Sequence, residues 1–293
     1  MPFPKIKKTS GILSIWKTVI DLILSEPKVL IPFAIFAGVE VITLYLLASS
    51  PHFPVNIVLG PPIRRIWGEI YLHYPFIYEL LARIFYYANM VVGVLVGSLT
   101  SGMAVYMVFL FKKKEKPALR PVFFTVLKRY ASLFILTVIL FSAVHFLMKQ
   151  PAFILVKYFR ARHVKLLFLG PKFWFNVFLP VLNFTLAVVL QGLFVYSIPY
   201  VVLKGKKFLS ALLAGIGLFF RMALKTLLVI IVPMCLYIPM TMLRSNLGFL
   251  ADKFAPESIV VVLFLGILVG TIIVDALITI ATTLLFIEAT HET

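Results

Sequence analysis

The chain is poor in cysteine and in negative charge. Its 293 residues include one cysteine, Cys235, which leaves no partner for an internal disulfide and no basis for a cysteine-ligated metal cluster. Asp and Glu together number 11, against 28 Lys and Arg. Enzymes that act on phospholipid headgroups through metal ions generally need several carboxylates together, so this scarcity lowers the expectation of such an enzyme.

Catalytic and cofactor motifs are also missing. The sequence has no P-loop, no dinucleotide-binding glycine motif and no nucleophile elbow. Of the five histidines, His145 alone lies in a long apolar run. No second histidine follows it at helical spacing, so a bis-histidine haem or an HExxH zinc site has no support. We therefore expect no metal and no cofactor, and we favour a non-enzymatic role.

Apolar residues and positive charge are abundant. Hydrophobic residues make up 62% of the chain, its mean hydropathy is +1.06, and its formal net charge is +17. A soluble domain of this composition would need an interior far larger than 293 residues can enclose, whereas lipid solvates the apolar surface of a membrane protein. The excess Lys and Arg is then expected at the membrane faces, where it sets topology and meets anionic lipid.

Six apolar runs are long enough to cross a hydrocarbon layer of about 30 Å, which takes about 20 helical residues. These runs cover residues 29–49, 88–111, 131–148, 176–203, 224–243 and 258–287. The predicted fold is all-α, a polytopic membrane protein with six transmembrane helices in a single integral membrane domain over residues 1–293. Five prolines in these runs are expected to mark kinks or helix ends: Pro32, Pro180, Pro199, Pro233 and Pro239.

Lys and Arg are distributed unevenly between the two sides of these runs. The N-terminus and the second and fourth connections carry 17 of them, and the other three connections carry 11. Because cytoplasmic segments carry the excess of positive charge, both termini are predicted to be cytoplasmic. The membrane is predicted to be the inner (plasma) membrane of the cell.

A stretch with one apolar face precedes each odd-numbered run. Before the first run, Ile12, Trp16 and Ile23 fall on one helix face, and similar stretches begin near residues 121 and 209. We interpret them as three cytoplasmic amphipathic helices that lie in the membrane interface. Their common phase suggests a threefold internal repeat, although amphipathic linkers are common in any polytopic protein. The repeat units would be about 10–111, 118–203 and 207–287.

Two patches resemble a group of prokaryotic six-span membrane proteins. The stretch SEPKVLIPFAIF opens the first run, and YVVLKGKKFLSALLAGIGLFFR leads into the fifth. The group includes the integral membrane domain attached to some glycerophosphodiester phosphodiesterases, together with related uncharacterised families. The resemblance implies the same six-span architecture. Hydrolase activity is not expected to carry over, because six residues follow the last run and leave no room for a catalytic domain.

Glu40, Asp275 and His145 are polar candidates within the apolar runs. A charged carboxylate at such depth costs at least about 2.5–3.5 kcal/mol on insertion scales. The functional interpretation is a proton or cation relay, or a contact with substrate. The alternative is a protonated or hydrogen-bonded acid that joins two helices. We expect His145 to be satisfied by a neighbouring group or to face the interface.

The outer connections mix aromatic and basic residues, which is typical of segments at headgroup level. Their basic residues are candidates for binding lipid phosphates, with plain anchoring as the alternative. These candidates are Arg64, Arg65, Lys157, Arg160, Arg162, Lys165 and Lys172. We expect no nucleic-acid partner, because no polar domain accompanies the basic residues.

Small residues recur every four positions in two of the runs. They are Gly93, Gly97 and Ser101 in the second run, and Gly266 and Gly270 in the sixth. Small residues at this spacing let helices approach closely. We expect packing within the chain, with dimerisation or room for a lipid tail as alternatives.

Together these features favour a non-catalytic, lipid-interacting integral membrane module with a structural, regulatory or accessory role. Its expected partners are anionic phospholipids and, through its helices, a second copy or another membrane protein. One alternative is a small transporter or lipid-translocating protein that uses the intramembrane carboxylates. The second alternative is a membrane-embedded lipid enzyme.

Overall fold

The structure is a computed structural model that describes residues 11–161, 174 and 178–291. The described residues are helical with short connections, and no strand occurs among them. This agrees with the predicted all-α class. Five helical segments are long and apolar enough to cross a membrane, and a bent pair of helices brings the number to six. The five segments are Pro27–Ala48, Phe76–Lys112, Tyr130–Ile154, Leu179–Lys204 and Ser258–Thr290.

Several spans contain more than one helical element. The first comprises η1 (Pro27–Leu30) and α2 (Ile31–Ala48). The second comprises α4 (Phe76–Val92), the π-helical η3 (Gly93–Gly97) and α5 (Ser98–Lys112). The third lies in α7 (Tyr130–Ala161), and the fourth comprises α9 (Leu179–Phe194) and α10 (Ser197–Lys204). The sixth comprises α15 (Ser258–Ile267), the π-helical η5 (Leu268–Asp275) and α16 (Ala276–His291).

The predicted fifth run is not one helix. It is divided into α12 (Ala223–Leu236) and α13 (Ile238–Ser245), which meet at Tyr237. Pro239 lies in the first turn of α13, where a missing N–H costs no hydrogen bond, so a helix start at this point is favourable. The preceding helix α11 (Phe208–Arg221) meets α12 at an angle of 95°.

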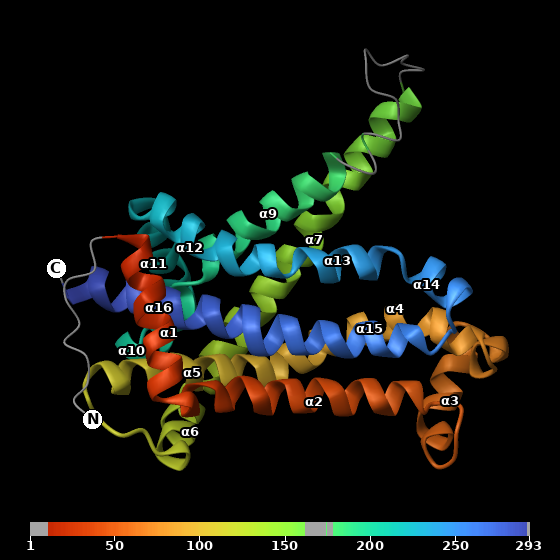
Figure 1. Cartoon of the computed structure of the whole chain (residues 1–293), viewed down its shortest axis with the longest axis horizontal. Coiled ribbons are helices and arrows are strands. Elements are labelled where there is room, and N and C mark those ends of the chain that lie inside the picture. Colours follow the sequence, from red (N-terminus) through yellow and green to blue (C-terminus); the bar gives the residue numbers. More distant parts are fainter. Residues whose placement is uncertain (1–10, 162–173, 175–177, 292–293) are drawn as a thin grey trace.

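The long helices lie roughly side by side, and the short ones gather at the two ends of the bundle (Figure 1). At one end, here called the α1 end, are α1 (Ile12–Ser25), α6 (Leu119–Leu127), α11 and the end of α16. At the opposite end are α3 (Val55–Ile66), η2 (Glu69–Leu72) and α14 (Leu247–Lys253). The helices α7 and α9 contact each other and diverge from the rest (Figure 1).

The largest buried core lies at the α1 end. It combines side chains from α1, α5, α6, α7, α10, α11 and α16. Tyr196 is fully buried there, and its hydroxyl lies 2.7 Å from Oγ1 of Thr226 in α12. Arg129 donates hydrogen bonds to the carbonyls of Val201 and Val202 near the end of α10. These contacts tie the short helices to the spans.

The small residues predicted to mediate packing face other helices of the same chain. A Cβ on Gly93 would lie 3.0 Å from Cζ of Phe141 in α7, and one on Gly97 would lie 3.0 Å from Cζ of Phe36 in α2. Ser101 is half-buried in α5. Gly93 and Gly97 also bound the π-helical segment of the second span, which the apolar pattern did not predict.

Candidate functional site

Glu40 is buried among the spans near the middle of α2, with 3% of its surface exposed. Thr271, in the π-helical η5 of the last span, donates a hydrogen bond to Oε2 of Glu40 at 2.5 Å. The side chain of Asn89, near the end of α4, also lies within hydrogen-bonding reach of this carboxylate. Side chains from three spans therefore meet at Glu40.

Arg244 supplies a positive charge to this site. It lies in α13, its Cζ is 5.6 Å from the centre of the Tyr237 ring, and it acts electrostatically on Glu40. A Cβ on Gly266 would come within 2.9 Å of Arg244 Cζ, and one on Gly270 would lie 3.3 Å from the Tyr237 ring. The predicted pair of small residues in the last span thus makes room for Arg244 and Tyr237.

Asp275 lies one turn beyond Thr271, at the end of η5. Glu40 and Tyr237 both interact with it electrostatically, so the structure brings together the two carboxylates that the sequence predicted as candidates. Asp275 is exposed although it lies deep among protein atoms, and its neighbours Val274 and Ala276 are buried.

We call Glu40, Asn89, Tyr237, Arg244, Thr271 and Asp275 the intramembrane polar cluster. Two carboxylates and one guanidinium share an apolar bundle, where an unpaired charge is expensive. Arg244 offsets the charge of Glu40, and the hydroxyl of Thr271 satisfies one of its oxygens. The arrangement joins α2, α4, η5 and α13.

His145 is not part of this cluster. It lies on α7, where its Nδ1 is 3.0 Å from the hydroxyl of Tyr86 in α4. Tyr87 packs near the same imidazole, with ring centroids 6.5 Å apart. The hydrogen bond joins the second and third spans, and a neighbouring group satisfies His145 as expected.

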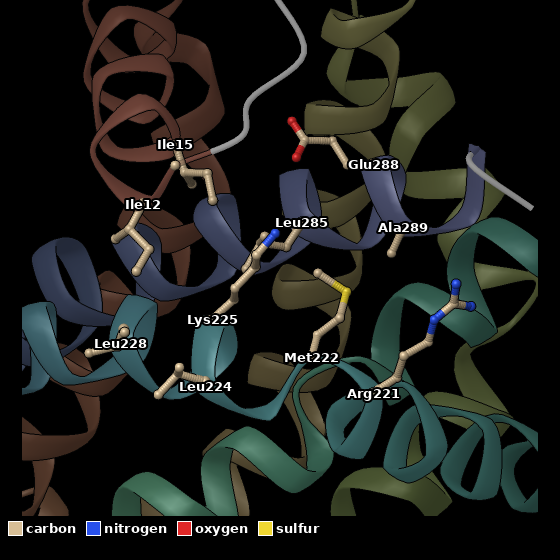
Figure 2. Close-up of a pocket in the computed structure, with 11 residues that line it drawn as sticks. Ile12, Ile15, Arg221, Met222, Leu224, Lys225, Leu228, Leu285, Glu288 and Ala289 are labelled. Atoms are coloured by element: carbon tan, nitrogen blue, oxygen red, sulfur yellow. The ribbon is translucent and has the colours of Figure 1, made fainter.

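A second candidate site is a pocket at the α1 end, with a volume of about 410 Å³ (Figure 2). It lies between α1, the sharp bend from α11 into α12, and the end of α16. Eleven residues line it: Gly11, Ile12, Ile15, Arg221, Met222, Leu224, Lys225, Leu228, Leu285, Glu288 and Ala289. This volume lies within the range of about 300–1,000 Å³ that is usual for small-molecule sites.

The pocket combines apolar walls with charged groups. Arg221 and Lys225 are exposed, Leu285 is buried, and Leu224 has 73% of its surface exposed. Figure 2 shows Lys225 reaching from α12 towards Leu285 of α16. Glu288 interacts electrostatically with Lys112 at the end of α5. Arg221 and Lys225 outnumber Glu288 among the charged residues that line the pocket, so its lining has a net positive charge.

The predicted headgroup candidates lie elsewhere. Arg64 is exposed at the end of α3, with its Nε 3.5 Å from Oε1 of Glu69, and Arg65 beside it is also exposed. Lys157 is exposed near the end of α7. Arg160 belongs to α7, but its side chain lies outside the described part of the structure. Arg162, Lys165 and Lys172 lie outside the described residues.

Sequence reasoning missed most members of both sites. Arg244 was not predicted as a site residue, although it follows Tyr237 by seven residues and so shares its helix face. Arg221 and Lys225 were not predicted as site residues. The sequence carried no signal that the segment with these two residues meets α1 and α16.

No protein-family model, no curated protein and no solved structure matches this chain.

Proposed function

We propose that the chain is a non-catalytic module of the plasma membrane that binds anionic phospholipid at the pocket of the α1 end. The observation that carries this proposal is the pocket itself, where Arg221 and Lys225 stand over apolar walls from α1, α12 and α16. A phospholipid has the matching chemistry, with an anionic phosphate joined to apolar chains. Basic pockets between transmembrane helices on the cytoplasmic side are a known type of site for such headgroups.

The short helices at the α1 end support a position at the membrane interface. Leu13 and Leu24 of α1 are 86% and 76% exposed, although Ile15 and Val19 of the same helix are buried. On α11, Leu213 is 64% exposed in the same way. Apolar side chains on the outside of helices that also bury an apolar face are suited to acyl chains rather than to water.

The distribution of basic residues supports the orientation. Of the 17 Lys and Arg that the sequence assigns to the cytoplasmic side, 14 belong to the described residues, and they lie in or beside the helices that meet at the α1 end. With both termini in the cytoplasm, the pocket opens at the inner leaflet, whose anionic lipids attract basic groups by about 1 kcal/mol per Lys or Arg. In this proposal, lipid bound in the pocket is what gives the module its structural, regulatory or accessory role.

The test compares two double variants of equal charge. Arg221→Gln with Lys225→Gln removes both cations of the pocket, and Lys116→Gln with Lys128→Gln removes two exposed cations from the loop after α5 and the end of α6. Native mass spectrometry and a vesicle-binding titration would measure phosphatidylglycerol bound by each. We expect the pocket variant to bind about thirtyfold more weakly, from about 2 kcal/mol, and the control to stay near the unsubstituted protein.

The same titration separates a lipid from a free anion. Inorganic phosphate is not expected to displace phosphatidylglycerol, because it lacks the chains that contact Leu224 and Leu228. Equal loss of lipid in both double variants would contradict the proposal, since it would show a general effect of surface charge.

A second function, a small transporter or lipid-translocating protein, is favoured by the intramembrane polar cluster. Glu40 and Asp275 come from the first and last spans and meet beside Arg244. The assay is the transbilayer movement of a fluorescent phospholipid in reconstituted vesicles under a pH gradient. Transport predicts that Glu40→Gln and Asp275→Asn abolish the movement while the protein remains folded. A helix-joining role predicts no movement with any variant, including the unsubstituted protein.

A further inference from the structure

Charged residues of the pocket at the α1 end lie one helical turn nearer to that end than apolar residues on the same helices. On α16, Glu288 follows the buried Leu285 by three residues, and on α12, Lys225 precedes Leu228 by three. The two helices run in opposite directions, because α16 ends at the α1 end and α12 begins there beside α11 (Figure 1). Three residues correspond to about 4.5 Å along a helix axis. The pocket therefore has a charged layer towards the α1 end and an apolar layer behind it.

This layering matches the order of groups in a phospholipid. In each leaflet the acyl chains lie towards the middle of the bilayer, and the phosphate and headgroup lie at its surface. Leu228 and Leu285 belong to the apolar layer, whereas Arg221 and Lys225 are exposed cations suited to the phosphate. The phosphate does not account for Glu288, because a carboxylate repels it. Another part of the ligand must face this residue.

Glu288 is placed to accept a hydrogen bond from a ligand. It is half-buried near the end of α16 and shares a helix face with Leu285. Figure 2 shows its carboxylate pointing from α16 towards Ile15 of α1, across the pocket that both residues line. Lys112, which does not line the pocket, interacts with it electrostatically. Because a carboxylate accepts several hydrogen bonds, this interaction leaves Glu288 able to accept one from inside the pocket.

The charges of the lining suit a ligand with one negative charge. Two cations, Arg221 and Lys225, and one carboxylate, Glu288, sum to +1. A phosphodiester headgroup with no other charged group carries a single negative charge, so it makes the occupied pocket neutral. A phosphate monoester, as in phosphatidic acid, approaches two negative charges at pH 7 and exceeds that balance. Phosphatidylethanolamine is a zwitterion and leaves the positive charge of the lining unbalanced.

We propose that Glu288 selects the lipid of the pocket by accepting a hydrogen bond from a headgroup hydroxyl, while Arg221 and Lys225 bind the phosphate. The ligand is then a phosphodiester with a hydroxyl-bearing headgroup, as in phosphatidylglycerol. A hydrogen bond to a charged acceptor is stronger than one between neutral groups, so a headgroup without a hydroxyl forgoes a substantial part of the binding free energy. This inference rests on the proposed lipid site and adds the headgroup chemistry that the site selects.

The first experiment compares two lipids of equal charge on the unsubstituted protein. Phosphatidylglycerol and phosphatidylmethanol are both phosphodiesters with one negative charge, but only phosphatidylglycerol has headgroup hydroxyls. Native mass spectrometry and vesicle-binding titration would measure both lipids with the same acyl chains. We expect phosphatidylglycerol to bind about tenfold more tightly, because one charge-assisted hydrogen bond distinguishes the two complexes. Equal affinities would overturn the proposal without any substitution, and so would equally tight binding of phosphatidylethanolamine.

The second experiment removes the carboxylate. In Glu288→Ala the two lipids should bind equally, whereas Glu115→Ala, which removes an exposed carboxylate from the loop after α5, should keep the tenfold ratio of about 1.4 kcal/mol. A general effect of charge strengthens the binding of both lipids alike and leaves the ratio unchanged. If Arg221→Gln with Lys225→Gln weakens lipid binding but the ratio persists in Glu288→Ala, the lipid site stands and the headgroup selection is wrong. If the unsubstituted protein binds neither lipid, the proposed function itself is wrong.

Discussion

Replacement of Gly215 by alanine tests the packing of α11 against α10, which sets the position of the bend beside the pocket. A Cβ on Gly215 would lie 2.6 Å from Oγ of Ser197, 2.9 Å from its backbone nitrogen and 3.2 Å from its Cα. The hydroxyl can rotate away, but the backbone nitrogen and Cα cannot. The two helices must therefore separate, and overpacking of this kind typically costs about 1–3 kcal/mol.

Gly217 provides a matched control on the same helix. It is exposed, and a Cβ there would meet nothing within 4 Å. Both substitutions gain the same helix propensity, about 1 kcal/mol for alanine over glycine, so this gain cancels in the comparison. Gly215→Ala should therefore be less stable than Gly217→Ala by about 1–3 kcal/mol.

The assay is unfolding of both variants in mixed detergent micelles, followed by far-UV circular dichroism. Adding Ser197→Ala to Gly215→Ala should restore only part of the loss, because the backbone nitrogen remains at 2.9 Å from the new Cβ. Equal stability of the two glycine variants, or full restoration by Ser197→Ala, would refute the close approach of α11 and α10.

Two further predictions concern single hydrogen-bonding groups. Thr271→Val should destabilise the protein by about 1–3 kcal/mol, because it leaves Glu40 without its hydroxyl donor. Thr271→Ser keeps the hydroxyl and should lose less stability. Unfolding in micelles measures both variants, and an equal loss of stability would contradict the role of the hydroxyl. Arg129→Ala should lower the free energy of unfolding by about 1.5–3 kcal/mol, because it removes charge-assisted hydrogen bonds to the carbonyls of Val201 and Val202. Replacement of the exposed neighbour, Lys128→Ala, should change it by less than about 0.5 kcal/mol. Similar values for the two variants would show that these hydrogen bonds contribute nothing to stability.

The fold class and most spans were predictable because hydropathy is a local property of consecutive residues. A run such as 29–49 needs no knowledge of its neighbours to be recognised, and the structure has a helical segment long and apolar enough to cross a membrane at Pro27–Ala48. The fifth span was predicted less well. Its apolar composition is continuous, but the break at Tyr237 and the 95° bend before α12 depend on how the helices pack. The threefold repeat and the cytoplasmic termini stay predictions.

The candidate sites were predictable in part. Glu40 and Asp275 were identified because ionisable residues are rare and costly inside an apolar run. That they share one cluster was not predictable, since they belong to the first and last spans and no spacing rule connects them. Gly266 and Gly270 were recognised as places of close approach, but the sequence did not show that the approaching groups are Arg244 and Tyr237.

By itself, the sequence determined that this chain belongs in a membrane, how many apolar segments it contains and which residues are out of place in them. These properties follow from the transfer free energies of residues taken one after another. Tertiary structure alone decided which charges meet. Arg129 and Arg244 were equivalent positive charges in the sequence, yet one caps the end of α10 and the other faces Glu40 inside the bundle. The reason is physical: pairing depends on distances across helices, which the spacing of residues along the chain does not specify.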